Sequence, residues 1–407
     1  MSRMKRIYEP LILHHLNHYS QMVFLSGPRQ AGKTTIAQWI GNHFPNFIYL
    51  NWDVTETRRL IMEGVLAVGK THGADELKSQ KSIIIFDEIH KYTHWKTFIK
   101  GFYDTYKNVF QIIATGSSHL DIYQQGGDSL MGRYFQYHIY PLSVGELLER
   151  PLSPDANEEI FSPQALKEED FQKLWNFSGF PDPYLANNKK FHTKWEATKT
   201  SQLFKEDIRD LTNIHEVDQM EIFSILLKNQ VGGLLNRSKL AKHLQVSIPT
   251  ISKWLSALEN LYFSFRIYPW STNIARSLIK EPKIFLYDWS TLEDIGQKCE
   301  NFIAYHLLKA VSYWNDTGLG KYELRFIRDK EKREIDFLIV KNGQPWTLIE
   351  AKHSERSLSK NLEIFQKMLG AQHAFQVVLE MPFVNFDCFS INYPVVVPAK
   401  TFLSQLP

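Results

Sequence analysis

The feature that most constrains the fold is the segment Gly27-Pro-Arg-Gln-Ala-Gly-Lys-Thr34, which fits the pattern G-x-x-x-x-G-K-S/T. It lies between an apolar run at residues 21–26 and a stretch at residues 34–43 that has the composition of a helix. In a strand–loop–helix unit of this kind, successive backbone N–H groups can turn inward around a phosphate at the positive end of the helix. The segment therefore predicts a phosphate-binding loop, or P-loop.

Short apolar runs alternate with helical stretches over the first 150 residues. Strands are predicted at residues 21–26, 47–51, 83–87, 111–115 and 134–139, and helices at 34–43, 54–68 and 95–106. Because the strands are apolar on both faces, we expect a mainly parallel sheet covered by helices. The predicted fold class of this part is α/β, a P-loop αβα sandwich.

Two carboxylates end the strand predicted at residues 83–87. Asp87 and Glu88 follow an apolar run, where charge is costly unless the strand end faces a polar site. With a P-loop upstream the expected ligand is ATP, with Thr34 and Asp87 as ligands of Mg²⁺. Lys33 is expected to reach the β- and γ-phosphates, and Glu88 to act as general base toward the attacking water. The residues predicted to bind the nucleotide are Gly27, Pro28, Arg29, Gln30, Ala31, Gly32, Lys33, Thr34, Thr35 and Ser117.

Three further residues are candidates for the same site. Thr115 and Ser117 stand at the end of the strand predicted at residues 111–115. They could sense the γ-phosphate or orient the water; the alternative is that they only end the strand in a turn. Arg133 is a candidate catalytic arginine that stabilises transition-state charge, in its own subunit or from a neighbouring one. The alternative for Arg133 is a surface ion pair.

These segments resemble the archaeal-type AAA+ ATPases, which are bacterial and archaeal proteins. The resemblance in the first part of the chain rests on GPRQAGKTT, IIIFDEIHK with Trp95 downstream, ATGSSHL, and Gly132-Arg133 followed by Tyr140-Pro-Leu-Ser and Glu146. Gly179-Phe-Pro181, Asp207 and Glu300-Asn-Phe302 resemble the companion domain that this family usually carries. The resemblance implies an AAA+ sandwich that binds ATP and often forms oligomers, so a homo-oligomer is one expectation.

The middle of the chain predicts a helix–turn–helix. Residues 237–260 carry apolar side chains at helical spacing in two stretches, with Ser247 in the turn and Pro249 in the first turn of the second helix. A strand-like run at residues 261–268 follows as a candidate wing, so a winged-helix domain is expected. The residues that would face the groove of DNA are Thr250, Ser252, Lys253 and Ser256. The alternatives are a contact with protein or a structural spacer.

Acidic residues interrupt two strands predicted at residues 334–340 and 346–352. Asp336 lies in the first strand, and Glu350 and Lys352 lie in the second, where a period of two puts them on one face. Two acids on neighbouring strands can bind Mg²⁺ or Mn²⁺, and a nearby lysine can orient or activate water. The three residues are therefore candidate catalytic residues, and the two acids are candidate metal ligands.

This set resembles the PD-(D/E)XK nucleases, which implies an α+β nuclease-like domain. Glu300, which precedes a helix predicted at residues 301–308, matches the upstream acid of that group and is a further candidate metal ligand. Gln366 is a candidate for the polar residue often found after the lysine. The proline that usually precedes the first aspartate is absent, and Ile335 stands there. The alternative is a nuclease-like fold without catalysis, in which these residues form ordinary ion pairs.

Composition limits the choice of partners. The 47 Lys and Arg residues exceed the 44 Asp and Glu residues by only three, so any contact with DNA requires a local basic patch. The two cysteines, Cys299 and Cys388, are too few for a disulfide framework and are expected to be buried thiols. We find no apolar run long enough to cross a membrane, so a cytoplasmic protein without a membrane partner is expected.

Three domains are expected along the chain. These are an AAA+ ATPase domain at residues 1–150, a helical linker and winged-helix domain at 151–280, and a nuclease-like domain at 281–407. The leading hypothesis is an ATPase that couples hydrolysis of MgATP to DNA binding or processing. One alternative is a nucleotide-switched regulator or scaffold with an inert nuclease-like domain. The other is a nuclease whose ATPase controls access to the cleavage site.

Overall fold

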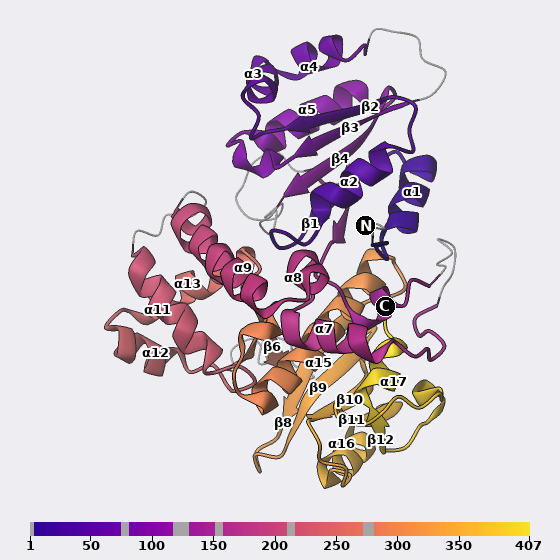
Figure 1. The fold of residues 1–407 in the computed structure, drawn as a ribbon, viewed down its shortest axis with the longest axis vertical. Coiled ribbons are helices and arrows are strands. Elements are labelled where there is room, and N and C mark those ends of the chain that lie inside the picture. The colour runs from indigo at the N-terminus through magenta and orange to yellow at the C-terminus, as the bar shows by residue number, and fades with distance from the viewer. Residues whose placement is uncertain (1–3, 75–80, 117–129, 151–157, 210–215, 272–280) are drawn as a thin grey trace. The chain divides into compact units, whose positions relative to one another are not determined.

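The chain divides into two units in the computed structural model, each described here by itself (Figure 1). The first comprises Met1–Tyr140 and Pro151–Ala156, and the second comprises Pro141–Arg150 and Asn157–Pro407. The structure describes residues 4–74, 81–116, 130–150, 158–209, 216–271 and 281–407. Within these ranges no helix combines the length and the apolar character needed to cross a membrane.

A five-stranded parallel sheet forms the centre of the first unit. Its strands are β1 (Met22–Ser26), β2 (Phe47–Asn51), β3 (Ser82–Asp87), β4 (Phe110–Gly116) and β5 (Tyr134–His138). They lie in the order β2-β3-β4-β1-β5, and every pairing is parallel. The predicted parallel α/β sheet is therefore confirmed. Since all strands point the same way, their carboxyl ends meet at one edge of the sheet, where the P-loop begins.

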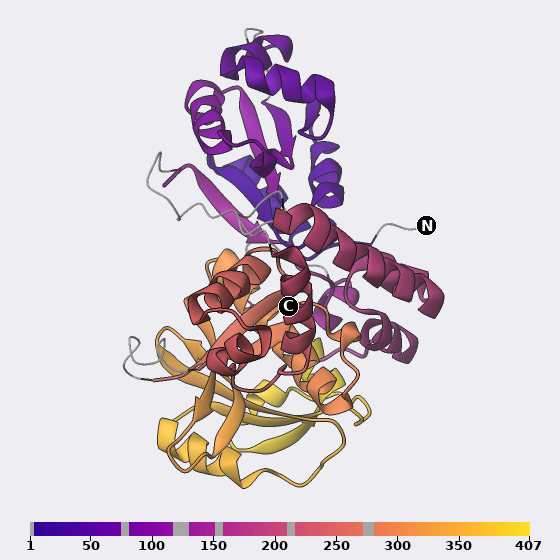
Figure 2. The same cartoon turned by 90° about the vertical axis from the view of Figure 1, so that its left-hand side faces the viewer.

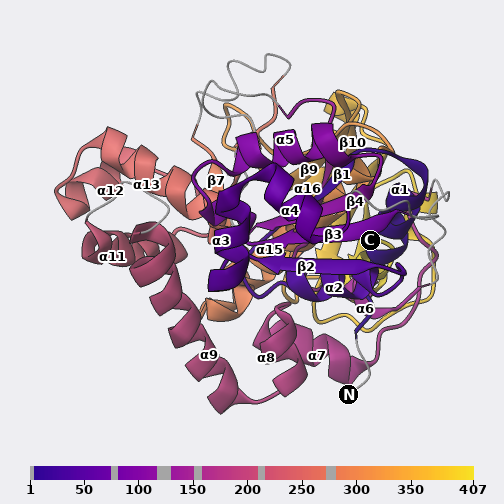
Figure 3. The same cartoon turned by 90° about the horizontal axis from the view of Figure 1, so that it is seen from above.

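Helices cover both faces of this sheet. They are α1 (Glu9–His18), α2 (Lys33–Gly41), α3 (Thr55–Glu63), α4 (Val65–Thr71) and α5 (Trp95–Tyr106), with a 3₁₀ turn η1 (Ile89–Lys91) after β3. Figure 3 shows α1 and α2 on one side of the strands and α5 on the other. The helix predicted at residues 54–68 is interrupted at Gly64, whose φ of 108° a helix cannot continue. The sequence interpretation missed α1.

Aromatic packing by α5 fixes the strands that carry the site. Phe98 and Phe102 lie one turn apart on α5 and pack against Phe86 of β3. Trp95 of the same helix packs edge-on against Phe24 of β1. All of these rings are buried. The P-loop strand and the Asp87 strand are therefore held by one helix.

The second unit begins with helices. They are α6 (Val144–Leu147), α7 (Glu168–Phe177), α8 (Pro181–Ala186), α9 (Lys189–Gln202), a π-helical turn (Leu203–Ile208), α11 (Val217–Lys228), α12 (Arg237–Leu244) and α13 (Ile248–Asn260). The last three pack around a common core that includes Phe223, Leu240 and Trp254. Ser247 accepts a hydrogen bond from the Thr250 backbone N–H and thereby caps α13, next to the predicted turn.

A seven-stranded mixed sheet follows, with its strands coloured orange to yellow in Figure 2. They are β6 (Ser264–Pro269), β7 (Lys283–Leu286), β8 (Tyr322–Arg328), β9 (Glu334–Lys341), β10 (Gln344–Lys352), β11 (His373–Val378) and β12 (Val395–Pro398), in the order β12-β11-β10-β9-β8-β6-β7. Helix α15 (Ile295–Asp316) packs on β7 to β10, and α16 (Lys360–Leu369) packs on β9 to β11. Helix α17 (Ala399–Ser404) closes the unit, and both cysteines are buried free thiols.

The structure divides the chain differently from the sequence prediction. The boundary expected at residue 280 falls between β6 and β7, which pair with each other as antiparallel strands. Strand β6 also pairs with β8, so the helical segment and the C-terminal sheet belong to one unit. The earlier division comes after Tyr140 and not at residue 150, because residues 141–150 pack within the second unit.

Candidate nucleotide site and a second acidic cluster

The P-loop connects β1 to α2 at the carboxyl edge of the N-terminal sheet. Gly27 and Gly32 have φ angles of 148° and 93°, which favour glycine. A Cβ atom on Gly27 would lie 2.1 Å from the carbonyl oxygen of Ile139, so only glycine fits there. Helix α2 begins at Lys33, directly after the loop. The loop therefore has the strand–loop–helix context that the motif requires.

Lys33 is folded onto the loop that it follows. Its side chain is buried, and Nζ donates hydrogen bonds of 2.8 Å to the carbonyl oxygens of Gly27 and Pro28. These contacts keep the ammonium beside the loop. Among the other predicted nucleotide ligands, Thr35 is exposed and Arg29 is half-buried. The predicted Ser117 lies outside the described residues.

Asp87 is surrounded by hydroxyl groups. Thr34 Oγ1 lies 3.1 Å from both carboxylate oxygens, and Tyr49 Oη donates to Oδ2 at 2.5 Å. Thr115 Oγ1 donates to Oδ1. Burial, then the hydrogen bond to Asp87 and the charge of Asp87, raise the pKa of Tyr49, so this phenol remains a donor. The carboxylate is buried, yet its two oxygens and the three hydroxyl oxygens could accept a hard cation in exchange for hydrogen bonds.

Glu88 occupies a strained turn directly after β3. Its φ of 56° places a non-glycine residue in the left-handed region, which is uncommon and concentrates at functional sites. The backbone N–H of Glu88 donates to Thr115 Oγ1 at 3.2 Å. Its carboxylate lies 3.7 Å from His90 Nε2 and 3.7 Å from Lys91 Nζ. The turn therefore aims Glu88 separately from Asp87, as two different roles require.

Tyr49 and His90 are members of the site that the sequence interpretation missed. Burial, followed by the positive charges of Lys33, Lys91 and Arg29, lowers the pKa of His90 to about 3. The imidazole beside Glu88 is therefore neutral at ordinary pH. The signal for Tyr49 was its place in β2, two residues before Asn51, which aligns with Asp87 across the sheet.

Arg6 is a third missed residue, and it supports the loop from behind. Its guanidinium is buried and donates to the carbonyl oxygens of Ala31, at 2.6 Å, and of Tyr140, at 2.5 Å. The backbone N–H of Arg6 donates to Glu9 Oε1 at 3.1 Å. The P-loop is thereby tied to Tyr140, which follows β5.

The structure does not bring Arg133 to the P-loop of its own chain. Arg133 stands just before β5, and its carbonyl accepts a hydrogen bond from Met22 at the start of β1. It therefore lies at the sheet edge opposite the P-loop, a strand length away. Its guanidinium forms a two-bonded ion pair with Asp104, at 2.9 and 3.1 Å. The surface ion pair, one of the two alternatives, is the arrangement that the structure has.

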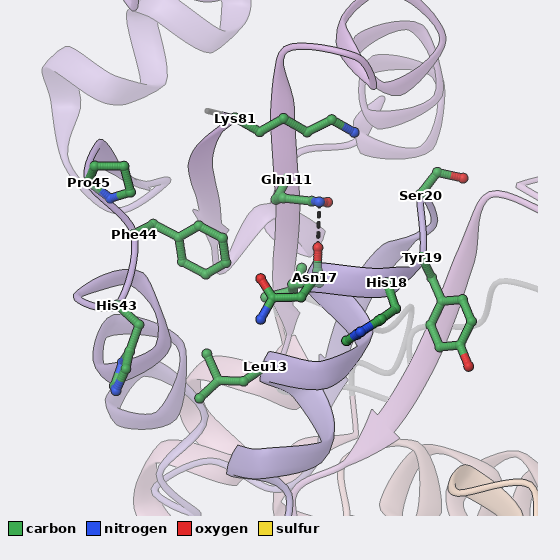
Figure 4. A pocket seen from close by; sticks show the side chains of 11 residues that line it. Leu13, Asn17, His18, Tyr19, Ser20, His43, Phe44, Pro45, Lys81 and Gln111 are labelled. Atoms are coloured by element: carbon green, nitrogen blue, oxygen red, sulfur yellow. Dashed lines mark hydrogen bonds between the residues drawn. The ribbon is translucent and has the colours of Figure 1, made fainter. Parts of the chain in front are cut away.

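A hollow of about 530 Å³ also lies at this opposite edge (Figure 4). Figure 4 shows Asn17, Phe44 and Gln111 around it, and Gln111 donates its amide hydrogen to the carbonyl of Leu16. Its lining includes no P-loop residue. It is therefore separate from the candidate nucleotide site.

The C-terminal candidates do come together, at a defect in the sheet. Between Ile335 and Leu338, β9 has one residue more than the facing part of β8, which is a β-bulge. Asp336 lies in this bulge, and its Oδ2 accepts a hydrogen bond of 2.9 Å from the backbone N–H of Ala351. The Asp336 side chain thus takes the place of a backbone acceptor between β9 and β10, next to Glu350 and Lys352.

Glu350 and Lys352 form a close pair beside Asp336. Lys352 Nζ lies 2.9 Å from Glu350 Oε1, as their shared face predicts. Glu350 Oε2 is buried and has no hydrogen-bond partner among the described residues. Burial and then the Asp336 charge raise the pKa of Glu350. The three candidates therefore lie together, but a cation other than a metal is already present.

That cation is the ammonium of Lys283, which no sequence motif indicated. It lies 2.7 Å from Glu334 Oε1, 3.0 Å from Glu300 Oε1 and 3.5 Å from Asp336 Oδ1. Burial opposes its charge, but Glu300, Asp336 and Glu334 outweigh burial and raise the pKa of Lys283. Within the described ranges, no group of three or more His, Cys, Asp or Glu side chains is arranged to hold a metal ion.

Gln366 is not part of this cluster. Its amide donates to the carbonyl oxygens of Ala371 and Asn392, at 3.2 and 3.0 Å, at the C-terminal end of α16. A different glutamine lies beside the cluster: Gln376 of β11, the strand next to β10, aligns with Glu350. Its buried amide bonds the backbone at Ser357 and Ser359, in the segment after Lys352.

Comparison with known families agrees with this geometry for the first unit. Residues 19–148 match a family described as an AAA domain, which agrees with the P-loop and the parallel sheet of this unit. Residues 168–295 and 295–394 match two domains of unknown function, designated DUF8612 and DUF4143. Their junction falls at the first residue of α15.

Related chains span most of this one. An uncharacterised protein of Mycobacterium tuberculosis is 22% identical over 360 residues, which is 85% of this chain and 73% of that protein. One of Methanocaldococcus jannaschii is 26% identical over 393 residues, or 85% of this chain and 79% of that protein. The solved AMPPCP-bound DnaA of Aquifex aeolicus covers 61% of this chain and 86% of its own, with 16% identity. Its TM-score of 0.29 is too low to bear on fold or function.

Proposed function

We propose that this protein hydrolyses MgATP in its first unit and couples the nucleotide cycle to DNA through its second. The observation that carries the ATPase proposal is the contact of Thr34 with both oxygens of Asp87, beside a P-loop whose Lys33 is buried. A hydroxyl and a carboxylate that meet at the carboxyl edge of a parallel sheet are the donor set that MgATP requires.

The residues divide the reaction between them. The P-loop and Lys33 bind the β- and γ-phosphates, for which Lys33 Nζ exchanges its carbonyl partners. Thr34 and Asp87 hold Mg²⁺, which neutralises phosphate charge when it is bound. Glu88 accepts the proton of the attacking water. His90 is buried and its pKa is lowered, so it adds no positive charge beside Glu88.

The DNA part of the proposal rests on the helix pair α12–α13. Its exposed side includes Arg237, Lys239, Lys242 and Lys253. The one acidic residue of the pair, Glu259, is bound by Arg266 at 2.5 Å and is thereby neutralised. A local basic surface on a helix–turn–helix can attract the DNA backbone although the whole chain is close to neutral. The antiparallel strands β6 and β7 stand where a wing would follow.

We expect Arg133 to take part in catalysis only when the protein has assembled with other copies of itself. Since Arg133 lies a strand length from its own P-loop, a role in catalysis would need a neighbouring copy, and the exchange of Asp104 for nucleotide phosphate. Sedimentation with and without ATP tests this. Arg133→Ala should leave ATP affinity unchanged and lower hydrolysis only under conditions where the protein is assembled.

The steady-state ATPase rate, measured with and without single-stranded, duplex and branched DNA, tests the main proposal. Glu88→Gln provides the blank because it keeps the size of the side chain and removes the base. A several-fold stimulation by one form of DNA is expected. An ATPase rate equal to the blank would overturn the assignment of the site, and a real rate that no DNA changes would overturn the coupling.

A second candidate is a nucleotide-switched regulator whose nuclease-like part is inert. The buried Lys283 at the centre of the C-terminal acids favours it over the nuclease alternative. In this case ATP would set the conformation or the assembly, and α12–α13 would bind an operator or a protein. Slow turnover that DNA leaves unchanged, with no metal-dependent cleavage of DNA, is its expected signature.

A further inference from the structure

The C-terminal acids already have a cation among them. A nuclease-like site needs Asp336, Glu350 and the upstream acid Glu300 to turn toward one divalent metal. In this structure Glu300 and Asp336 both turn toward Lys283 Nζ, at 3.0 and 3.5 Å. The side chain of Lys283 is 2% exposed, so the ammonium is enclosed and does not simply rest on the surface.

The surroundings of Lys283 hold it there. A third acid, Glu334, lies 2.7 Å from its Nζ and also pairs with Arg328 at 2.8 Å. The backbone of Lys283 is fixed from two sides, since β7 pairs with β6 and Leu234 forms a β-bridge with Lys283 itself. An ammonium held by three carboxylates on two other elements has little freedom to leave.

Glu300 is likewise committed to this arrangement. Gly232, in the segment between α11 and α12, has a φ of 77°, and a Cβ atom on it would lie 2.4 Å from Glu300 Oε2. The carboxylate is therefore packed against backbone on one side and bound to Lys283 on the other. The upstream acid is thus a counter-ion of the lysine.

A divalent ion and the ammonium would compete for the same oxygens. Asp336 Oδ2 is taken by the Ala351 N–H and its Oδ1 faces Lys283, so a metal would gain few ligands while it stood close to a fixed positive charge. Glu350 Oε2 is the one buried carboxylate oxygen of this group without a partner among the described residues. One oxygen does not make a site for a hard cation that seeks six or more ligands.

We propose that Lys283 takes the place of the divalent metal in this cluster, so that the C-terminal unit keeps a nuclease-like set of acids without metal-dependent chemistry. This inference rests on the nuclease-like interpretation of Asp336, Glu350 and Lys352, and it is independent of ATP hydrolysis. The cluster instead joins β7, α15 and β9 through one buried ammonium.

Binding of Mn²⁺ to nucleotide-free protein, followed by electron paramagnetic resonance of the free ion, tests the proposal. The full chain carries Asp87→Asn so that the N-terminal metal ligand does not contribute. Binding is compared before and after addition of Asp336→Asn. The expected result is no difference up to millimolar Mn²⁺. A stoichiometric site that disappears with Asp336→Asn would overturn the proposal, and this comparison needs no change of the lysine.

The second arm asks whether the lysine is the cause. Lys283→Gln should gain one Mn²⁺ site, at least ten-fold tighter than any binding by the parent, and Asp336→Asn should abolish it. The matched control is Lys309→Gln, since Lys309 is another buried lysine of the unit and pairs with Glu146; it should gain none. A folded Lys283→Gln protein that gains no site would overturn the assignment of Lys283 to the metal position. The ATPase assay is separate, so its failure would be recognised independently.

Discussion

Asp87 and Asp336 are both carboxylates on apolar strands, but their partners are opposite in kind. Asp87, at the end of β3, is surrounded by the hydroxyls of Thr34, Tyr49 and Thr115, and the nearby Lys33 is bound to backbone carbonyls. Asp336, near the start of β9, faces the ammonium of Lys283 directly. In the proposed function the first site receives a cation, whereas the second one contains its own.

This difference teaches that acidic residues at strand positions do not define a metal site by themselves. The cost of burying a carboxylate can be offset by neutral donors, which a metal can replace, or by a buried ammonium, which a metal must displace. Only the partners distinguish the two cases. The comparison can be tested by the same kind of substitution at corresponding residues of the two sites.

The largest expected effect is on ATP hydrolysis. Asp87→Asn should lower the rate by about 100-fold or more, because it removes a ligand of the metal that accompanies ATP. Asp336→Asn should leave the rate within about two-fold, since its partner is Lys283 and not a metal. Steady-state phosphate release measures both. Equal losses would show that the two acids serve one reaction, which would end the comparison.

The next effect concerns stability, and it compares two buried lysines. Lys283→Ala leaves three carboxylates without their cation and should cost about 3–5 kcal/mol of unfolding free energy. Lys33→Ala removes hydrogen bonds to two carbonyl groups, which should cost about 1–2 kcal/mol, while ATP binding is lost. Urea unfolding of the full chain, with ligand-free protein, measures both. A larger loss for Lys33 would contradict the assignment of partners.

Each unit contains a buried histidine whose pKa is lowered, His90 in the first and His306 in the second. Loss of stability in acid should therefore occur in both units, and it does not distinguish the two carboxylate sites. Burial lowers the pKa of His306, in the second unit, from 6.5 to about 3; the Phe302 carbonyl opposes this shift and Lys309 adds to it. Its Nε2 accepts from the Val144 N–H, and its Nδ1 lies 2.7 Å from the Phe302 carbonyl, so the neutral ring fits. The unfolded chain therefore binds the proton first as pH falls.

Stability of this unit should accordingly be lost below pH 6.5, toward pH 3, by about 1.4 kcal/mol for each pH unit from this group. Hydrogen exchange of the α15 amides at a series of pH values measures the loss. His306→Gln offers a donor and an acceptor but does not titrate, so its profile should be flatter by that amount. An identical slope in the variant would exclude His306 as the source.

The smallest expected effect comes from Tyr49. Tyr49→Phe removes one of the hydroxyls that hold Asp87, which should cost about 1 kcal/mol, or about a five-fold loss in kcat/KM for MgATP. Tyr103→Phe changes a buried tyrosine of α5 in the same unit and serves as the control. If the two variants lose the same activity, Tyr49 does not position the metal ligand.

Much of the first unit could be predicted because local pattern and tertiary structure agree there. The strand Phe47–Asn51 and the helix Trp95–Tyr106 have the predicted bounds, and the P-loop lies between a strand and a helix as predicted. What could not be predicted depends on pairing between distant positions. Tyr49 reaches Asp87 only because β2 lies beside β3, and no spacing rule connects the two residues.

The same reason explains the larger differences in the second unit. Lys283 stands far from Asp336 in sequence, and only the strand order puts them within 3.5 Å. Gln366 was a natural candidate by position, but the direction of α16 turns it toward Asn392. Arg133 was assigned from its neighbours Gly132 and Tyr140, whereas its distance from the P-loop follows from the parallel register of β5.

Strand β6 pairs with two strands, and this limits which parts of the chain could be replaced by parts of another protein. Strand β6 continues directly from α13, pairs with β7 on one edge and contributes to β8 on the other. The basic helix pair and the acid cluster therefore share a hydrogen-bonded strand and not a flexible linker. A chimaera that imported a foreign helix–turn–helix by a cut at residue 280 would remove a strand from the recipient sheet. Any swap that preserves folding has to carry the helices and the sheet together.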